Sequence, residues 1–167
     1  MLLICLFFAI LILGGIFCFY WENNTQNKAR AVIEDSSVIH LFRDKLDSET
    51  TDLEVEEMFK DQGRPLGAYT PFLRRFFARN YTLMGYRGDT LLFFFRNEDG
   101  KVGKLYGTCW EYDKGDEQLY ACFLQYLTGM LGKPVSHKTD GNTETAEWYG
   151  CRLLRTQKRI DFYRIMD

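Results

Sequence analysis

The chain has 167 residues, with 21 Lys and Arg against 23 Asp and Glu and a formal net charge of −2. This balance argues against an electrostatic nucleic-acid binder, which needs a basic face, so we expect no nucleic-acid partner. A hydrophobic content of 46% excludes global disorder, and 14 Gly with only 3 Pro exclude a collagenous chain.

All of the charged residues follow residue 21, because residues 1–21 contain no Asp, Glu, Lys, Arg or His. About 20 helical residues cross the core of a bilayer, so residues 1–21 are predicted to form one transmembrane anchor. A cleaved signal peptide is the rival interpretation, but it needs a basic start and an A-x-A-like cleavage site. Neither is present, and Cys18 is not preceded by the small residues that lipoprotein processing expects.

The orientation of this anchor is predicted from the residues that follow it. Lys28 and Arg30 favour a cytoplasmic domain by the positive-inside rule. Short N-terminal anchors commonly display their domain outside, and the sequons at residues 23–25 and 80–82 are compatible with export. We therefore expect a single-pass protein of a bacterial inner membrane with an extracytoplasmic domain, and the cytoplasmic side is the alternative.

Residues 22–50 are expected to form a stalk, and residues 51–167 one α+β globular domain. A short amphipathic helix in the stalk is predicted by apolar residues near helical spacing, Val38, Leu41 and Phe42. The first helix of the domain is expected to begin at the capping-box pattern Thr51–Glu54 and to end before Gly63.

A second helix is predicted over residues 71–80, because Thr70 is a capping residue and Pro71 suits the first helical position. This segment combines four large apolar side chains with three arginines, a composition typical of interface hot spots. We predict a partner-binding surface here, made of Phe72, Arg74, Arg75, Phe76 and Arg79. The alternative is that the apolar side chains are all buried and the arginines merely solvated.

The middle of the chain changes to strand patterns. The apolar run Thr90–Arg96 is predicted to be a central strand, residues 97–100 a hairpin turn, and Val102–Tyr112 the returning strand. Gly103 and Gly107 inside the second strand indicate a bulge or a close backbone approach.

The last third of the sequence predicts one long helix and a C-terminal hairpin. Asp116–Leu131 carries a single apolar stripe and is followed by Gly132, a helix stop. Thr145–Arg155 and Lys158–Met166 are expected to pair as antiparallel strands, with a small edge strand at residues 135–137. The order of elements predicts an α+β fold, in which helices pack on an antiparallel sheet.

Metal and phosphate chemistry has little support in the residues. His40 and His137 are far apart, and no C-x-x-C or H-E-x-x-H pattern occurs, so we expect no metal and no cofactor. Residues 100–104 resemble a fragment of a P-loop, but they lack its spacer and fall in the predicted hairpin.

The cysteines offer one candidate nucleophile. Cys122, with His137 and Asp140, has the residue types of a cysteine hydrolase, but it lies two turns inside the predicted helix, where the helix dipole cannot lower its pKa much. Cys109 and Cys151 fall on predicted strands and are expected to be reduced, with a disulfide between them as the alternative.

Because catalytic and cofactor signatures are missing, we expect a membrane-anchored, non-enzymatic domain that binds another protein. Two roles fit this expectation, an accessory subunit of a bacterial envelope complex and a toxin-neutralising, immunity-type protein. The alternatives are a small envelope hydrolase using Cys122 and His137, and a lipid- or peptidoglycan-binding module.

Overall fold

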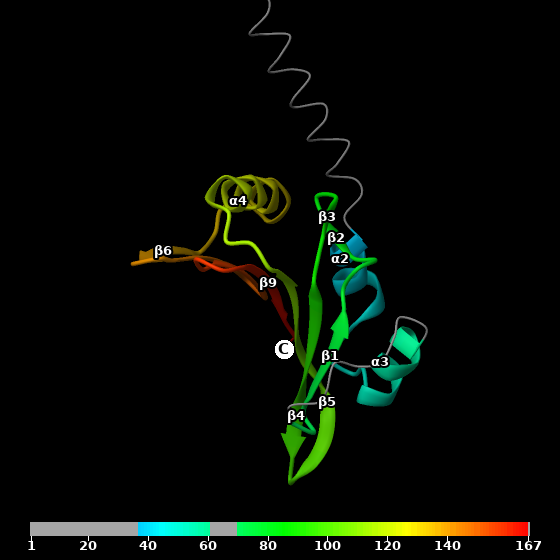
Figure 1. The fold of residues 1–167 in the computed structure, drawn as a ribbon. Coiled ribbons are helices and arrows are strands. Elements are labelled where there is room, and N and C mark those ends of the chain that lie inside the picture. Colours follow the sequence, from blue (N-terminus) through cyan, green and yellow to red (C-terminus); the bar gives the residue numbers. More distant parts are fainter. Residues whose placement is uncertain (1–36, 61–69, 167) are drawn as a thin grey trace, which may run out of the picture.

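The computed structural model describes residues 37–60 and 70–166, and it has an α+β fold (Figure 1). Seven strands form one sheet in the order β1-β4-β5-β9-β8-β7-β6, and all neighbours are antiparallel. The strands of this sheet are β1 (Leu73–Phe77), β4 (Thr90–Glu98), β5 (Lys101–Tyr112), β6 (Ser136–Asp140), β7 (Thr143–Trp148), β8 (Cys151–Arg155) and β9 (Ile160–Ile165). A separate small hairpin consists of β2 (Thr82–Leu83) and β3 (Tyr86–Arg87).

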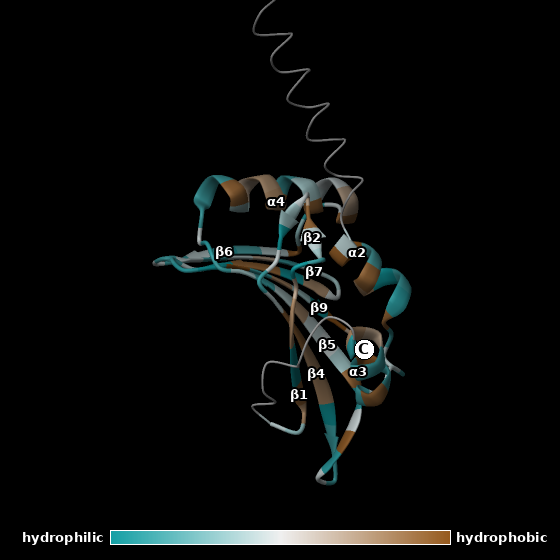
Figure 2. Ribbon diagram, turned by 45° about the vertical axis from the view of Figure 1, so that its right-hand side comes forward, coloured by the Kyte–Doolittle hydropathy of each residue, from teal (hydrophilic) through white to brown (hydrophobic). Residues whose placement is uncertain are grey.

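The helices lie on one side of this sheet, which bends so that they occupy its outer face (Figures 1 and 2). They are α2 (Ser37–His40), the π-helical turn η1 (Leu41–Lys45), α3 (Asp52–Phe59) and α4 (Glu117–Leu131). Each helix contributes aromatic or aliphatic side chains to one core. Alternate residues of the strands face the same core. Ring contacts of this core include Phe42–Phe162, Phe59–Phe93 and Trp110–Phe123.

The helix ends follow the capping signals in the sequence. Thr51 and Glu54 form both hydrogen bonds of the capping box at the start of α3. The Asp116 side chain accepts a hydrogen bond from the Leu119 N–H, and Gly132 ends α4 with a positive φ of 83°. The predicted start of α3 and both predicted ends of α4 are confirmed, whereas the predicted end of the first helix before Gly63 lies outside the described residues.

The hairpin β4–β5 is also confirmed, with a tighter turn than expected. Only Asp99 and Gly100 lie between the strands, and their φ angles of 52° and 80° suit a two-residue type I′ turn. The register shifts between Phe94 and Phe95, opposite residues 105–107, which places the predicted bulge beside Gly107.

The predicted helix over residues 71–80 is wrong, because residues 73–77 form the edge strand β1. Its five residues pair with β4, from Leu73 opposite Phe94 to Phe77 opposite Thr90. The apolar strand β4 needs a hydrogen-bonding partner on each side, and this long-range pairing overrides the local helix signals of Thr70 and Pro71.

The expected strand over residues 145–155 is two strands. The turn at Tyr149 and Gly150, with φ of 72° at Gly150, separates β7 from β8, so the tail is a meander rather than one hairpin. The predicted edge strand is present as β6, and it extends to Asp140.

Residues 37–46 fall within the range expected to be a stalk, and they contribute to the core. Val38, Leu41, Phe42 and Leu46 are all buried. The predicted anchor, residues 1–21, lies outside the described residues. Among the helices of residues 37–60 and 70–166, none is both long and apolar enough to span a bilayer.

Candidate functional site

The inner face of the bent sheet carries no helix among the described elements (Figures 1 and 2). Strand alternation and the pairing register identify which side chains lie there. Residues opposite one another on this face include Arg75 and Leu92, Cys109 and Tyr163, and Glu111 and Asp161. We call this surface the open face.

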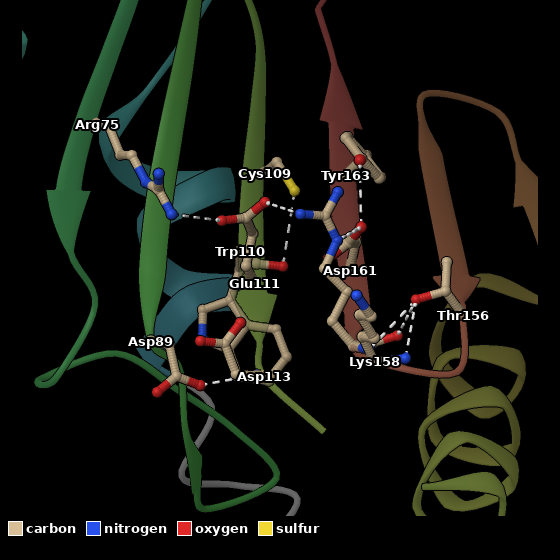
Figure 3. A network of polar contacts seen from close by, with 11 residues as sticks. Arg75, Asp89, Cys109, Trp110, Glu111, Asp113, Thr156, Lys158, Asp161 and Tyr163 are labelled. Carbon is tan, nitrogen blue, oxygen red and sulfur yellow. Dashed lines mark hydrogen bonds and ion pairs between the residues drawn. The ribbon is translucent and has the colours of Figure 1, made fainter. Parts of the chain in front are cut away.

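A cluster of ionisable side chains lies at the centre of the open face (Figure 3). Cys109 and Glu111 come from β5, and Asp161 and Tyr163 from the neighbouring strand β9. Adjacent registers bring these four side chains together, although about 50 residues of sequence separate the two strands. Cys109, Glu111 and Asp161 are all buried. Burial is unusual for the two carboxylates, Glu111 and Asp161.

Two arginines compensate the buried carboxylates. Arg159 Nη1 lies 3.1 Å from Glu111 Oε1, and Arg159 Nε lies 2.9 Å from Asp161 Oδ2. Arg75 Nη2 lies 3.7 Å from Glu111 Oε2, on the other side of this carboxylate. The Tyr163 hydroxyl donates a weaker hydrogen bond of 3.4 Å to Asp161 Oδ2. We call these residues, with Cys109, the ionic cluster.

Burial dominates the electrostatics of the ionic cluster. It raises the pKa of Asp161 to about 6, against the lowering effect of the Arg159 charge. Burial likewise raises the pKa of Glu111, and it holds the pKa of the Cys109 thiol well above its usual range. The carboxylates are therefore harder to ionise than exposed ones, despite their guanidinium partners.

The ionic cluster also has donor atoms that could hold a metal ion. The Cys109 sulfur and oxygens of Glu111 and Asp161 lie within 4.8 Å of one another, and Asp161 Oδ1 is buried without a hydrogen-bond partner. A cation would have to displace the Arg159 guanidinium, which contacts both carboxylates. The raised pKa of Cys109 also disfavours the thiolate that a metal requires. The arrangement therefore fits an ion-pair network better than a metal centre.

Apolar and aromatic side chains surround the ionic cluster on the open face. Phe77, Tyr106 and Ile165 are exposed, and the Phe94 and Tyr106 rings lie 6.1 Å apart between centroids. Further apolar residues of this face are half-buried, namely Leu73, Leu92 and Leu154. Such a surface offers hydrophobic contact area around a fixed set of charges.

The predicted partner-binding residues divide between the two faces of the sheet. Arg74 turns toward α3, where it pairs with Asp52 at 2.9 Å and Glu56 at 2.8 Å. Phe76 is buried in the core, stacked on Phe59. These two residues stabilise the fold and are poorly placed to meet a partner.

The other three lie at the edge or on the open face. Arg75 reaches toward Glu111, and the Arg79 guanidinium lies 5.4 Å from the centre of the exposed Phe77 ring. Phe72 is half-buried, and its carbonyl accepts a hydrogen bond from the Phe95 N–H. The sequence offered Arg159 and Asp161 only as part of a charged, solvated terminal hairpin, and it gave no reason to single out Glu111, because charged residues in or beside a strand are ordinarily assigned to solvent.

The residues of the hydrolase alternative have separate surroundings. Cys122 is exposed on α4, whereas His137 Nε2 on β6 lies 3.1 Å from Glu144 Oε1. Among the interactions of the described residues, none joins Cys122 to His137 or Asp140. Cys109, Cys122 and Cys151 are all free thiols. Cys109 and Cys151 are therefore reduced, as expected, and do not form the alternative disulfide.

Comparisons with protein-family models, with curated proteins and with solved structures find no match for this chain.

Proposed function

We propose that this chain is a membrane-anchored, non-enzymatic domain that binds another protein on the open face of its sheet. The observation that carries the proposal is the exposure of Phe77, Tyr106 and Ile165 on a sheet face that no described element covers. Exposed apolar clusters of this kind are typical of interaction sites, and aromatic residues are enriched in them.

The ionic cluster would give such an interface its specificity. Arg159 is partly exposed above buried carboxylates, so a partner would meet a positive group held in a fixed position. Charges placed in this way select partners and orient them more than they add affinity. A partner with an acidic group surrounded by apolar side chains fits this surface best.

The anchor supports a role at a membrane. Residues 1–21 are apolar and uncharged, and they precede a domain with an ordinary charge content. Both roles expected from the sequence, a subunit of an envelope complex and an immunity-type protein, place a protein-binding domain beside a membrane. The identity of the partner decides between them.

The anchor proposal predicts that the full-length chain stays in the membrane fraction through a carbonate wash. A chain beginning at Asn27 lacks the apolar segment and should appear in the soluble fraction, as its matched control. Immunoblots of both fractions provide the measurement. Release of the full-length chain by carbonate would exclude a spanning anchor.

Partner binding is tested by photocrosslinking in cells, with a photoreactive phenylalanine analogue at Tyr106. The matched control is Tyr86, which is equally exposed (44% against 43%) but lies on the helix-bearing side, against Phe123. We expect a protein adduct from position 106 and none from position 86. Mass spectrometry of the adduct then identifies the partner.

A second variant tests the same surface. Ile165→Asp should reduce the adduct from position 106 at least about tenfold, roughly 1.4 kcal/mol of binding free energy, without lowering the melting temperature. Equal adducts from positions 86 and 106 would count against the open face.

A catalytic role for Cys122 would appear instead as loss of function in a folded Cys122→Ser variant.

A further inference from the structure

A second concave site lies on the opposite, helix-bearing side of the sheet. It is a cleft of about 510 Å³ between η1, the C-terminal end of α4 and strands β8 and β9. Its volume falls in the range of about 300–1,000 Å³ that is usual for small-molecule sites. The lining residues are Ile39, Phe42, Arg43, Met130, Leu131, Cys151, Phe162 and Arg164. The protein-binding surface proposed above uses none of these residues.

The lining of this cleft is apolar apart from two positive charges. The Phe42 and Phe162 rings are stacked with centroids 5.7 Å apart, and Met130 and Leu131 remain exposed at the end of α4. Large apolar side chains left open to solvent beside a cleft favour an apolar occupant. The lining includes no carboxylate, so the site as a whole favours an anion.

The two arginines differ in what they can offer to an anion. Arg43 is exposed and already pairs with Asp44, with Nε 2.7 Å from Oδ1. Arg164 is half-buried, and its Nη1 donates a hydrogen bond of 3.3 Å to the Leu46 carbonyl. Among the described residues, no ion pair joins Arg164 to a carboxylate, although hydrogen bonds, foremost from Thr50, and the Arg164 charge lower the pKa of the nearby Asp47 carboxyl. Arg164 therefore has donors in a fixed position for an incoming carboxylate.

We propose that this cleft binds a fatty acid, with its alkyl chain against Phe42, Met130 and Leu131 and its carboxylate on Arg164. A cleft of about 510 Å³ is within the range of about 300–1,000 Å³ that holds small-molecule ligands, which leaves room for an alkyl chain. A site lined on several sides by aliphatic and aromatic groups suits a flexible chain better than a flat polar ligand.

The free thiol in the lining permits a direct test on the full-length protein, held in solution by an amphipathic polymer. Cys151 is half-buried in the cleft, whereas Cys122 is exposed on α4 outside its lining and serves as an internal control. Iodoacetamide labelling is followed at both positions by mass spectrometry, with myristate as the probe. At ten times the dissociation constant, myristate should slow labelling of Cys151 about tenfold by mass action, and labelling of Cys122 should not change.

The neutral analogue and one variant test the role of Arg164. Myristyl alcohol, which has the same chain without the charge, should protect Cys151 much less than myristate does. Arg164→Gln should remove this difference, whereas Arg152→Gln on the open face should preserve it. Protection is expressed relative to the unliganded form of each variant, because Arg164 also affects the ionisation of Cys151.

Three outcomes would overturn the proposal. Labelling of Cys151 that saturating myristate leaves unchanged would show that the cleft does not take the acid. Equal protection by acid and alcohol would remove the carboxylate site. Protection of Cys151 by phosphatidylglycerol vesicles but not by myristate would assign the cleft to another occupant.

Discussion

A chain that begins at Thr51 is expected not to fold, although the sequence places the start of the globular domain there. It would lack Val38, Leu41, Phe42 and Leu46, which are all buried in the core. Removing one large core side chain costs about 2–5 kcal/mol, and a whole domain is stable by only about 5–15 kcal/mol. The loss of four such side chains, about 8–20 kcal/mol in sum, is as large as the whole stability of a domain.

The measurement is near-ultraviolet circular dichroism or a two-dimensional amide spectrum of chains that begin at Asn27 and at Thr51. We expect dispersed, native-like signals from the longer chain only. Within the longer chain, Phe42→Ala should cost about 3–5 kcal/mol of unfolding free energy. Leu53→Ala is the control, because Leu53 is 72% exposed and should change stability by less than about 0.5 kcal/mol. A cooperative fold from Thr51 would instead make residues 37–46 an accessory segment.

The elements that could be predicted from the sequence are those specified by neighbouring residues. The capping box at Thr51, the Asp-Gly turn at residues 99–100 and the Gly132 stop all act within a few positions along the chain. Helix α4 carries its own apolar stripe, with Leu119, Phe123 and Leu127 on the buried side. Such signals remain readable without knowledge of the tertiary structure.

The two wrong predictions of secondary structure have different physical causes. Residues 73–77 have a local helix pattern, but their pairing with β4 makes them a strand. The run from Thr145 to Arg155 appears continuous in the sequence, and only a positive φ at Gly150 divides it. At residues 73–77 long-range hydrogen bonding selects one of two local conformations, whereas Gly150 divides its segment through a local two-residue turn.

The ionic cluster could be foreseen only in part. Alternation along the segments Cys109–Tyr112 and Ile160–Tyr163 puts each carboxylate on a definite face of its strand. It does not reveal that these two strands are neighbours, or that Glu111 lies opposite Asp161. The predicted partner surface assumed a helix. In the strand that forms instead, the neighbouring residues Arg74 and Arg75 point to opposite faces of the sheet.

Replacement of Arg159 tests what holds the ionic cluster together. Arg159→Gln removes the group that contacts both buried carboxylates, and the variant must bury them with weaker compensation. Because the Arg159 side chain is 44% exposed and partly screened by water, we expect the low end of such effects, about 2–3 kcal/mol. Urea unfolding at pH 7.5 measures the loss.

The open face supplies a closely matched control for this change. Arg152 is also 44% exposed, and its Nε lies 2.8 Å from Glu147 Oε1, but the Glu147 side chain is 35% exposed. Arg152 contacts one carboxylate that is partly exposed, whereas Arg159 contacts two that are buried, so Arg152→Gln should cost less than about 0.5 kcal/mol. Equal effects of the two substitutions would show that the burial of Glu111 and Asp161 does not matter.

The last prediction is that Asp161→Asn stabilises the protein at pH 7.5, although it removes a partner of Arg159. The folded-state pKa of Asp161 is about 6, above the ordinary value of 3.8. The contribution of this carboxyl to stability is thus fully present below about pH 4 and is lost as the pH rises through about 6. An amide cannot ionise, so the variant avoids this loss. We expect a gain of about 3 kcal/mol at pH 7.5 and less than about 1 kcal/mol at pH 4.

Urea unfolding of both proteins from pH 4 to pH 8 measures this gain, and the exposed Asp140→Asn variant should show a difference that does not vary with pH. A less stable Asp161→Asn variant at pH 7.5 would mean that the ion pair with Arg159 outweighs the cost of burial. Asp161→Asn and Arg159→Gln should also have non-additive effects on stability, because Arg159 and Asp161 form one ion pair with each other. With Asn at position 161, Arg159→Gln should cost less than it does alone, since only the Glu111 carboxylate then remains to be compensated.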